Sequence, residues 1–145
     1  MLFRIKIQST SDLITNSSSE VFVVKTGTYS IPEIKELIQV VGEVCAKAYD
    51  DNWKVNAKKS WTQLEQEDMD GSSGMGGELS VRSWKEEYEY RSKYIPEYTV
   101  EDFLKDEGLE EEELNQHVWI DIDRERRGTI KYIFENFEVV EHDLC

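Results

Sequence analysis

The sequence has few cysteines, few prolines and no long hydrophobic run. Its 145 residues include only two Cys and two Pro. Cys45 and Cys145 form no CxxC pair and are too few for a disulfide framework, so we expect reduced thiols. No apolar run approaches the ~20 residues of a membrane-spanning helix, which argues against a membrane protein. The first residues, MLFRIKIQSTSD, lack the apolar core of a secretory signal, so we expect a cytoplasmic location.

The composition favours one small folded domain over residues 1–145. Hydrophobic residues make up 39% of the chain and aromatic residues 11%, which suffices for a single core and argues against global disorder. The sequence shows no internal repeat and no linker long enough to separate two domains. A stretch rich in glycine and serine indicates a flexible loop at 70–78.

Negative charge is concentrated in the second part of the sequence. The net charge is −14, of which residues 1–60 contribute +1 and residues 61–145 contribute −15. Nucleic-acid binding depends on clustered Lys and Arg, so this balance argues against a direct nucleic-acid partner. An acidic surface that contacts a basic protein is one explanation of the charge, and solubility alone is the simpler one.

Hydrophobic periodicity predicts the first strands and the first helix. Alternation from residue 3 to 8 and the β-branched, aromatic run at 21–24 each predict a strand. Ser30 and Glu33 have the spacing of a capping box, and apolar residues then recur at helical steps. This pattern predicts a helix over 31–49.

The rest of the chain is predicted to alternate between short helices and strands. We expect helices near 60–69, 84–91, 100–107 and 130–137, and strands at 79–82, 118–123 and 137–141. About ten residues connect the last two strands, which is near the lower limit for a parallel pair. The fold class that follows is mixed α/β: a single small domain with a four- to five-stranded mixed sheet and packed helices.

Residues 4–24, RIKIQSTSDLITNSSSEVFVV, resemble an N-terminal pattern of small uncharacterised proteins of bacteria and their phages. In that pattern a basic strand leads into a segment of the form (F/L)(V/I)(T/S)NSSSSSF and then into a second apolar strand. The matching part runs from Asp12 to Ser19 and resumes at Phe22, with Glu20 and Val21 in place of further serines. The resemblance implies a phage or prophage origin, and so the host cytoplasm, but no activity is attached to it.

A polar run lies between the first two predicted strands and consists of Thr15, Asn16, Ser17, Ser18 and Ser19. Such side chains commonly bond to nearby backbone groups in a turn, which is the simpler interpretation. The functional interpretation is a nest of N–H groups and hydroxyls that binds an anion, as in a small-ligand or nucleotide-binding protein. The run has no GK[ST] ending and is therefore not a P-loop.

Asp121 and Asp123 lie two apart on a predicted strand and so project from the same face. Carboxylate oxygens suit Mg²⁺ or Mn²⁺, which gives a divalent-metal-dependent enzyme as an alternative function. The simpler interpretation is the solvent side of an edge strand, with His117 on the same face as an ordinary surface residue. We expect no cofactor, with Mg²⁺ or Mn²⁺ as the alternative.

Other catalytic or metal arrangements find no support in the spacing. A calcium loop with Gly71 as its invariant glycine would place Gln66 and Gly77 at the first and twelfth ligand positions, which excludes an EF-hand. No serine lies in a GxSxG motif. Cys45 lies on the apolar face of its predicted helix, where we expect a core residue rather than a reactive one. The sequence therefore favours a non-enzymatic role.

Aromatic residues gather on one predicted helix, where Trp84, Tyr88, Tyr90 and Tyr94 occupy both faces. Because Tyr and Trp are enriched at interface hot spots, this group is the candidate protein interface, although some members can pack on the sheet instead. The acidic candidates for the same interface are Glu110, Glu111, Glu112 and Glu113.

These observations favour a non-catalytic, acidic accessory protein of a phage or bacterium that binds a protein partner. Blocking a host factor or a defence protein is one form that this role can take. The alternatives are a small-ligand or nucleotide-binding protein that uses residues 15–19, and a metal-dependent enzyme at Asp121 and Asp123. The sequence does not indicate the oligomeric state or the strand order.

Overall fold

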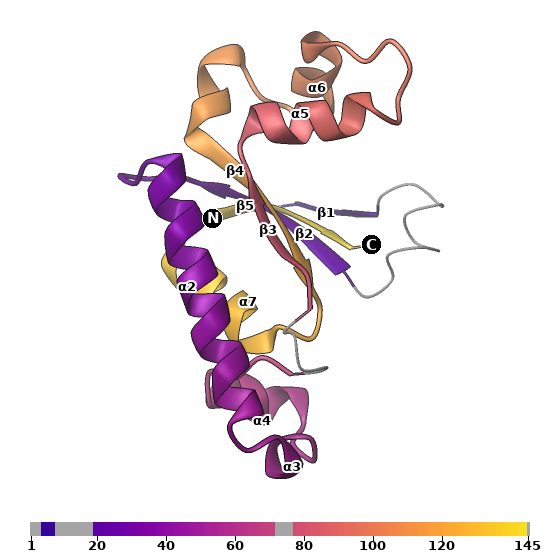
Figure 1. Cartoon of the computed structure of the whole chain (residues 1–145). Helices are drawn as coiled ribbons and strands as arrows, with labels where there is room; N and C mark the ends of the chain where they lie inside the picture. Colours follow the sequence, from indigo (N-terminus) through magenta and orange to yellow (C-terminus); the bar gives the residue numbers. More distant parts are fainter. Residues whose placement is uncertain (1–3, 8–18, 72–76, 145) are drawn as a thin grey trace.

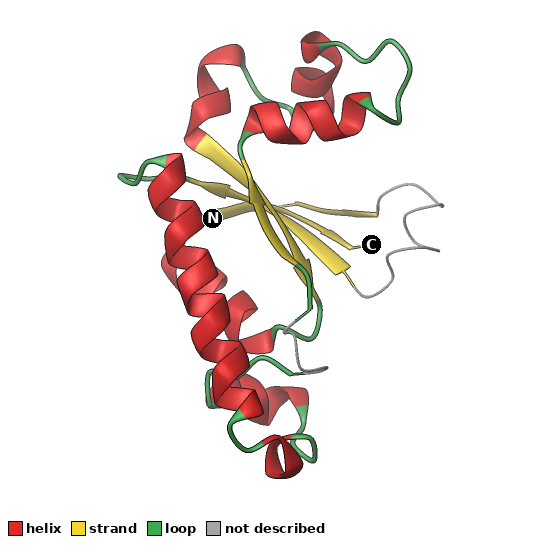
Figure 2. Cartoon of the chain, viewed as in Figure 1, coloured by secondary structure: helices red, strands yellow, loops and turns green. Residues whose placement is uncertain are grey.

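The computed structural model describes residues 4–7, 19–71 and 77–144. They form an α/β domain around one five-stranded mixed sheet, which confirms the predicted fold class. Figure 2 shows the strands gathered into one sheet with helices around it. The strands are β1 (Arg4–Ile7), β2 (Ser19–Lys25), β3 (Leu79–Arg82), β4 (His117–Asp123) and β5 (Val139–Leu144).

Six α-helices and one 3-10 helix complete the described part of the chain. They are α2 (Ile31–Asp50), α3 (Trp53–Asn56), α4 (Trp61–Gln66), α5 (Trp84–Ser92), α6 (Val100–Glu107), the 3-10 helix η1 (Glu111–Gln116) and α7 (Arg127–Asn136). Figure 1 shows α2 running along the sheet, with α3 and α4 at its lower end and α5 and α6 together at the upper end. Residues 72–76 of the predicted loop at 70–78 lie outside the described residues.

The strands lie in the order β1-β5-β2-β4-β3. β2 is antiparallel to both β4 and β5, β3 is antiparallel to β4, and β1 runs parallel to β5. β4 and β5 therefore run parallel to each other, but β2 lies between them. The short crossover through α7 thus joins two strands that are not neighbours, rather than an adjacent parallel pair.

Four α-helices begin with a capping box, at Ser30, Ser60, Ser83 and Thr99. In each, the hydroxyl of the cap accepts the N–H of the third helical residue, whose side chain accepts the N–H of the cap. These caps satisfy N–H groups that would otherwise lack partners at the first turn. The predicted cap of the helix at 31–49 is confirmed.

The first core lies between one face of the sheet and the helices α2 and α7. Phe22 of β2 and Ile120 of β4 are register partners, and both are fully buried. Burying each such side chain contributes about 1.5–3 kcal/mol to the free energy of unfolding. The buried members are Phe22, Val24, Ile34, Ile38, Val81, Val118, Ile120, Ile122, Ile130, Ile133, Phe137 and Val139.

The second core lies on the opposite face of the sheet, under α5, α6 and η1. Val23 and Trp119 are register partners here, and the ring of Phe103 lies 5.4 Å from the fully buried ring of Trp119. Because both faces are covered, residues 21–24 of β2 form a continuous apolar run rather than an alternating one. The partly buried residues around this core are Trp84, Tyr88, Tyr98, Leu104, Leu109 and Val140.

A buried carboxylate fixes the start of α7. Asp70 is fully buried and accepts hydrogen bonds from the N–H of Thr129 at 2.9 Å and from its hydroxyl at 2.8 Å. Thr129 is the third residue of α7, which has no side-chain cap of its own, so Asp70 acts as that cap from a distant segment. Arg126 pairs with Asp70 at 2.9 Å. Burial raises the pKa of Asp70, while the hydrogen bonds from Thr129 and the charge of Arg126 oppose that rise.

We expect Asp70→Ala to lower the free energy of unfolding by about 3–5 kcal/mol, because the buried charge of Arg126 would lose its counterion. Asp68→Ala is the matched control, since the Asp68 side chain is largely exposed and its pair with Lys131 contributes about 0–1 kcal/mol. Denaturant unfolding of both variants tests this. A loss below about 1 kcal/mol in Asp70→Ala would contradict the assigned role of the carboxylate.

The thiol of Cys45 is 4% exposed on the inner side of α2, as expected for a core residue. Burial, followed by the charge of Asp70, raises its pKa to about 11. In a Cys145→Ser background, we expect a thiol reagent at pH 8 to modify the folded protein at least about 100-fold more slowly than the unfolded chain. Similar rates in the two states would show that Cys45 is accessible and ionised in the fold.

Candidate functional site

The predicted interface aromatics, on α5 and just after it, divide between the core and the surface. Trp84 and Tyr88 pack into the second core, as the simpler interpretation of this group anticipated. Tyr90 and Tyr94 face outward, with 45% and 72% of their surface exposed. The exposed pair, and not the whole group, is therefore available to a partner.

Contacts within the fold hold the exposed pair in place. The rings of Tyr90 and Tyr94 meet edge to face with their centroids 5.4 Å apart. The guanidinium of Arg82 lies over the ring of Tyr90, 5.0 Å from its centroid. Ile95, 44% exposed, follows directly. We call Tyr90, Tyr94 and Ile95 the tyrosine patch.

Two arginines fix α5 and its patch to the sheet and to α6. Arg91 lies 2.9 Å from Glu87 and also pairs with Glu107 of α6. Arg82 of β3 lies 2.7 Å from the same Glu87 and 3.5 Å from Asp121 of β4. Burial alone would lower the pKa of the Arg91 guanidinium, but the charges of Glu107 and Glu87 raise it overall.

Acidic side chains outnumber basic ones in the segment that carries the tyrosine patch. Residues 84–116, which include α5, α6 and η1, contain twelve acidic and four basic side chains, a net charge of −8. Of the predicted acidic candidates, Glu110, Glu111 and Glu112 are exposed at the start of η1 and Glu113 is partly exposed. This layer, which we call the acidic layer, presents a negative surface with aromatic rings on it.

Asp121 and Asp123 do lie on one face of β4, but that strand is internal, between β2 and β3. The expectation of an edge strand is therefore wrong. Asp121 pairs with Arg82, and Asp123 accepts the N–H of Glu125 at 2.8 Å. Among the described residues, no three His, Cys, Asp or Glu side chains are grouped so as to hold a metal ion. A magnesium or manganese enzyme at this position gains no support from the geometry.

His117 is buried, contrary to its interpretation as a surface residue. Its Nδ1 lies 2.8 Å from the carbonyl oxygen of Glu113. Because a carbonyl oxygen only accepts, Nδ1 carries a hydrogen and donates it. His117 also lines a small pocket of about 250 Å³ together with Glu107 and Glu141.

The predicted anion-binding run is mostly outside the part of the chain that the structure describes. Thr15, Asn16, Ser17 and Ser18 lie outside the described residues. Ser19 begins β2, is buried, and has Asp123 as its register partner. The small-ligand hypothesis for this run stays a prediction.

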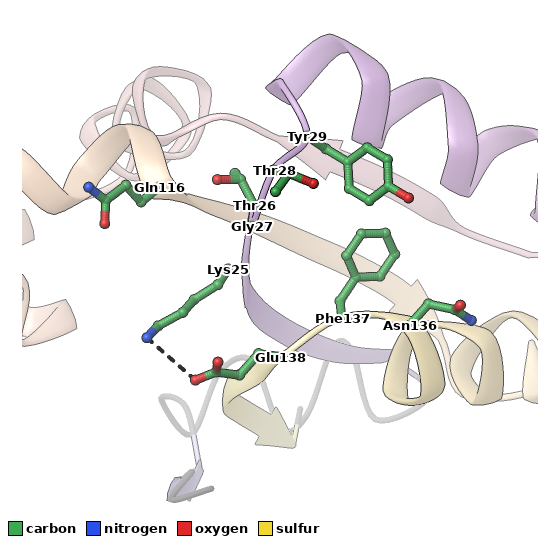
Figure 3. A pocket seen from close by; sticks show the side chains of 9 residues that line it. All are labelled: Lys25, Thr26, Gly27, Thr28, Tyr29, Gln116, Asn136, Phe137 and Glu138. Atoms are coloured by element: carbon green, nitrogen blue, oxygen red, sulfur yellow. Dashed lines mark ion pairs between the residues drawn. The ribbon is translucent and has the colours of Figure 1, made fainter.

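A larger pocket lies where β2 leads into α2, and the sequence reasoning did not anticipate it. Figure 3 shows its lining, which comes from residues 25–29, Gln116 and residues 136–138. Its volume is about 610 Å³. The only local signal was the Lys-Thr-Gly-Thr-Tyr run between a strand and a helix cap, which also fits an ordinary turn.

No protein family, curated protein or solved structure matches this chain. Within the described ranges, none of the helices combines the length and the apolar composition needed to cross a membrane.

We expect Arg91→Ala to lower the free energy of unfolding by about 2–3 kcal/mol, because Glu107 would lose a buried counterion. Lys93→Ala is the matched control on the same helix turn, since Lys93 is exposed and should change stability by less than about 0.5 kcal/mol. Thermal and denaturant unfolding measure both. Equal stability of the two variants would show that the pair does not anchor α5.

Proposed function

We propose that the protein is a non-catalytic binding protein whose acidic layer and tyrosine patch contact a basic protein partner. The observation that carries the proposal is the pair of outward rings, Tyr90 and Tyr94, on a surface segment with a net charge of −8. Exposed aromatic residues supply the buried contact area of interfaces, and the surrounding charge selects the partner.

The patch is favourable for binding because its side chains are already ordered. Association costs about 0.5–1.5 kcal/mol for each flexible side chain that becomes fixed at an interface. The edge-to-face contact between Tyr90 and Tyr94, and the Arg82 guanidinium over Tyr90, reduce that cost before the partner arrives. Each tyrosine also keeps a hydroxyl that can bond to the partner.

Charge complementarity indicates the chemistry of the partner. A surface with clustered Lys and Arg, such as a nucleic-acid-binding surface of another protein, would be attracted over roughly a Debye length, about 8 Å at physiological salt. The resemblance of the N-terminal segment to phage and bacterial proteins supports an accessory role in the host cytoplasm. In that role the acidic layer would occupy the basic surface of a host factor or defence protein.

We expect Tyr94→Ala to weaken the complex at least about tenfold while leaving the fold intact, because Tyr94 is the most exposed ring of the patch. The measurement is quantitative affinity capture from cells of the source organism, followed by titration of the captured partner. Trp53→Ala is the matched control, since Trp53 is also an exposed aromatic residue, at 58%, but lies on α3, far along the chain from α5.

A second variant separates charge from aromatic contact. Replacing Glu110, Glu111, Glu112 and Glu113 by Gln should weaken binding and flatten its dependence on salt. A partner that binds both variants and the wild type equally would overturn the proposal. So would a partner lost equally in Trp53→Ala and Tyr94→Ala.

A further inference from the structure

We propose that the pocket between the end of β2 and the start of β5 binds a small neutral ring that carries neighbouring hydroxyl groups. This chemistry occurs in a monosaccharide and in the ribose of a nucleoside. The site uses none of the residues of the tyrosine patch and shares only the uncharged Gln116 with the segment that forms the acidic layer, so it can be tested separately from the proposed protein partner. We call it the β2–α2 pocket.

The pocket has the size of a small-molecule site. Its volume of about 610 Å³ lies within the 300–1,000 Å³ that is usual for ligand pockets. Three distant parts of the chain form it, and backbone hydrogen bonds hold them together. The N–H of Lys25 donates to the carbonyl of Glu138, and the N–H of Thr26 donates to that of Gln116, both at 2.9 Å. These two bonds tie the turn at residues 26–29 to the segments that lead into β4 and β5.

Thr26 is the strongest sign of a polar ligand. The residue is only 6% exposed and lines the pocket, yet its hydroxyl makes no hydrogen bond to any residue that the structure describes. The hydroxyl oxygen is not one of the fully enclosed polar atoms that lack a partner, so it faces the open space of the pocket, where water or a ligand can bond to it. A ligand hydroxyl in the pocket would serve as that partner.

Other polar groups around the pocket offer both donors and acceptors. The amide nitrogen of Asn136 donates to the carbonyl of Tyr132 at 2.9 Å, which leaves its side-chain oxygen as an acceptor. Gln116 provides a second amide, and Thr28 a second hydroxyl. A hydroxyl group both donates and accepts, so neighbouring hydroxyls match such a mixed lining better than a group that only accepts.

The charges in the pocket favour a neutral ligand over an anion. Its single cation, among the described lining residues, is Lys25, which lies 3.4 Å from Glu138 (Figure 3). The pair is close to neutral in total, and the chain as a whole carries a net charge of −14. A phosphate would have to displace Glu138 from Lys25 and approach a negative protein.

One wall of the pocket is apolar. The rings of Tyr29 and Phe137 lie next to each other in Figure 3, with centroids 6.1 Å apart and planes inclined at 58°. The flat C–H face of a sugar ring can pack on such a wall while its hydroxyls reach the polar side. The open space around Gly27, where an added Cβ would meet nothing within 4 Å, leaves room for the rest of the ligand.

The experiment is saturation-transfer NMR on the full chain with each of four neutral probes and one anion at millimolar concentration. The neutral probes are methyl glucoside, methyl galactoside, adenosine and uridine, and the anion is inorganic phosphate. We expect transfer to at least one neutral probe and none to phosphate. A glycoside signal identifies a carbohydrate ligand, and a nucleoside signal without a glycoside signal identifies a nucleoside ligand.

Two comparisons show whether the hydroxyls and the assigned pocket are responsible. A dideoxy analogue of the bound probe should lose most of the signal. Thr26→Val should lower the affinity about fivefold, the effect of one hydrogen bond, without lowering the melting temperature. Thr62→Val is the matched control, because Thr62 is exposed on α4 outside the pocket.

Several results would overturn the proposal. These are the absence of transfer to every neutral probe, equal binding of the dideoxy analogue, and equal binding by wild type and Thr26→Val. Binding of phosphate alone, abolished in Lys25→Met, would instead assign the pocket to an anion. None of these results bears on the tyrosine patch, so failure here is distinguishable from failure of the proposed protein-binding function.

Discussion

The guanidinium of Arg126 is the contact on which the arrangement of helices around the sheet depends. It bonds to Asp70 after α4, to the carbonyl of Gly42 in α2, and to the carbonyl of Gly77 before β3. Arg126 itself precedes α7, so one side chain joins four segments. A buried cation is unfavourable unless each of its donors is satisfied, and this requirement fixes the segments relative to one another.

Much of the fold could be predicted from the sequence because its signals are local. Ser30 with Glu33, and Thr99 with Asp102, are separated by one helical turn and act on each other, so their caps are visible in the sequence. The strand order could not be predicted in the same way. Nothing near residues 4–7 indicates that they pair with β5, more than 130 residues later, and the cap of α7 comes from Asp70 rather than from its own N-terminus.

The candidate sites were also predictable only where their signals are local in the sequence. Spacing places Trp84 and Tyr88 on one face of the helix and shows that the aromatic group as a whole cannot share that face. Which side is buried depends on Phe103 and Trp119, which belong to other elements. The β2–α2 pocket was missed because its polar groups come from three separate segments, each of which is unremarkable alone. The interpretation of Asp121 as a residue of an edge strand was wrong because β3 pairs with β4 and makes it an internal strand. The sequence alone does not show this pairing.

The position of β5 also affects how the chain reaches this fold. β5 is the last of the five strands in the sequence, yet it lies between β1 and β2. During synthesis β1 therefore has no neighbour in the sheet until residues 139–144 have left the ribosome. Closing so long a segment of chain is slow compared with the pairing of nearby strands. The antiparallel strands β2, β3 and β4 can assemble earlier, and until β5 arrives the edge of β2 stays open to other chains.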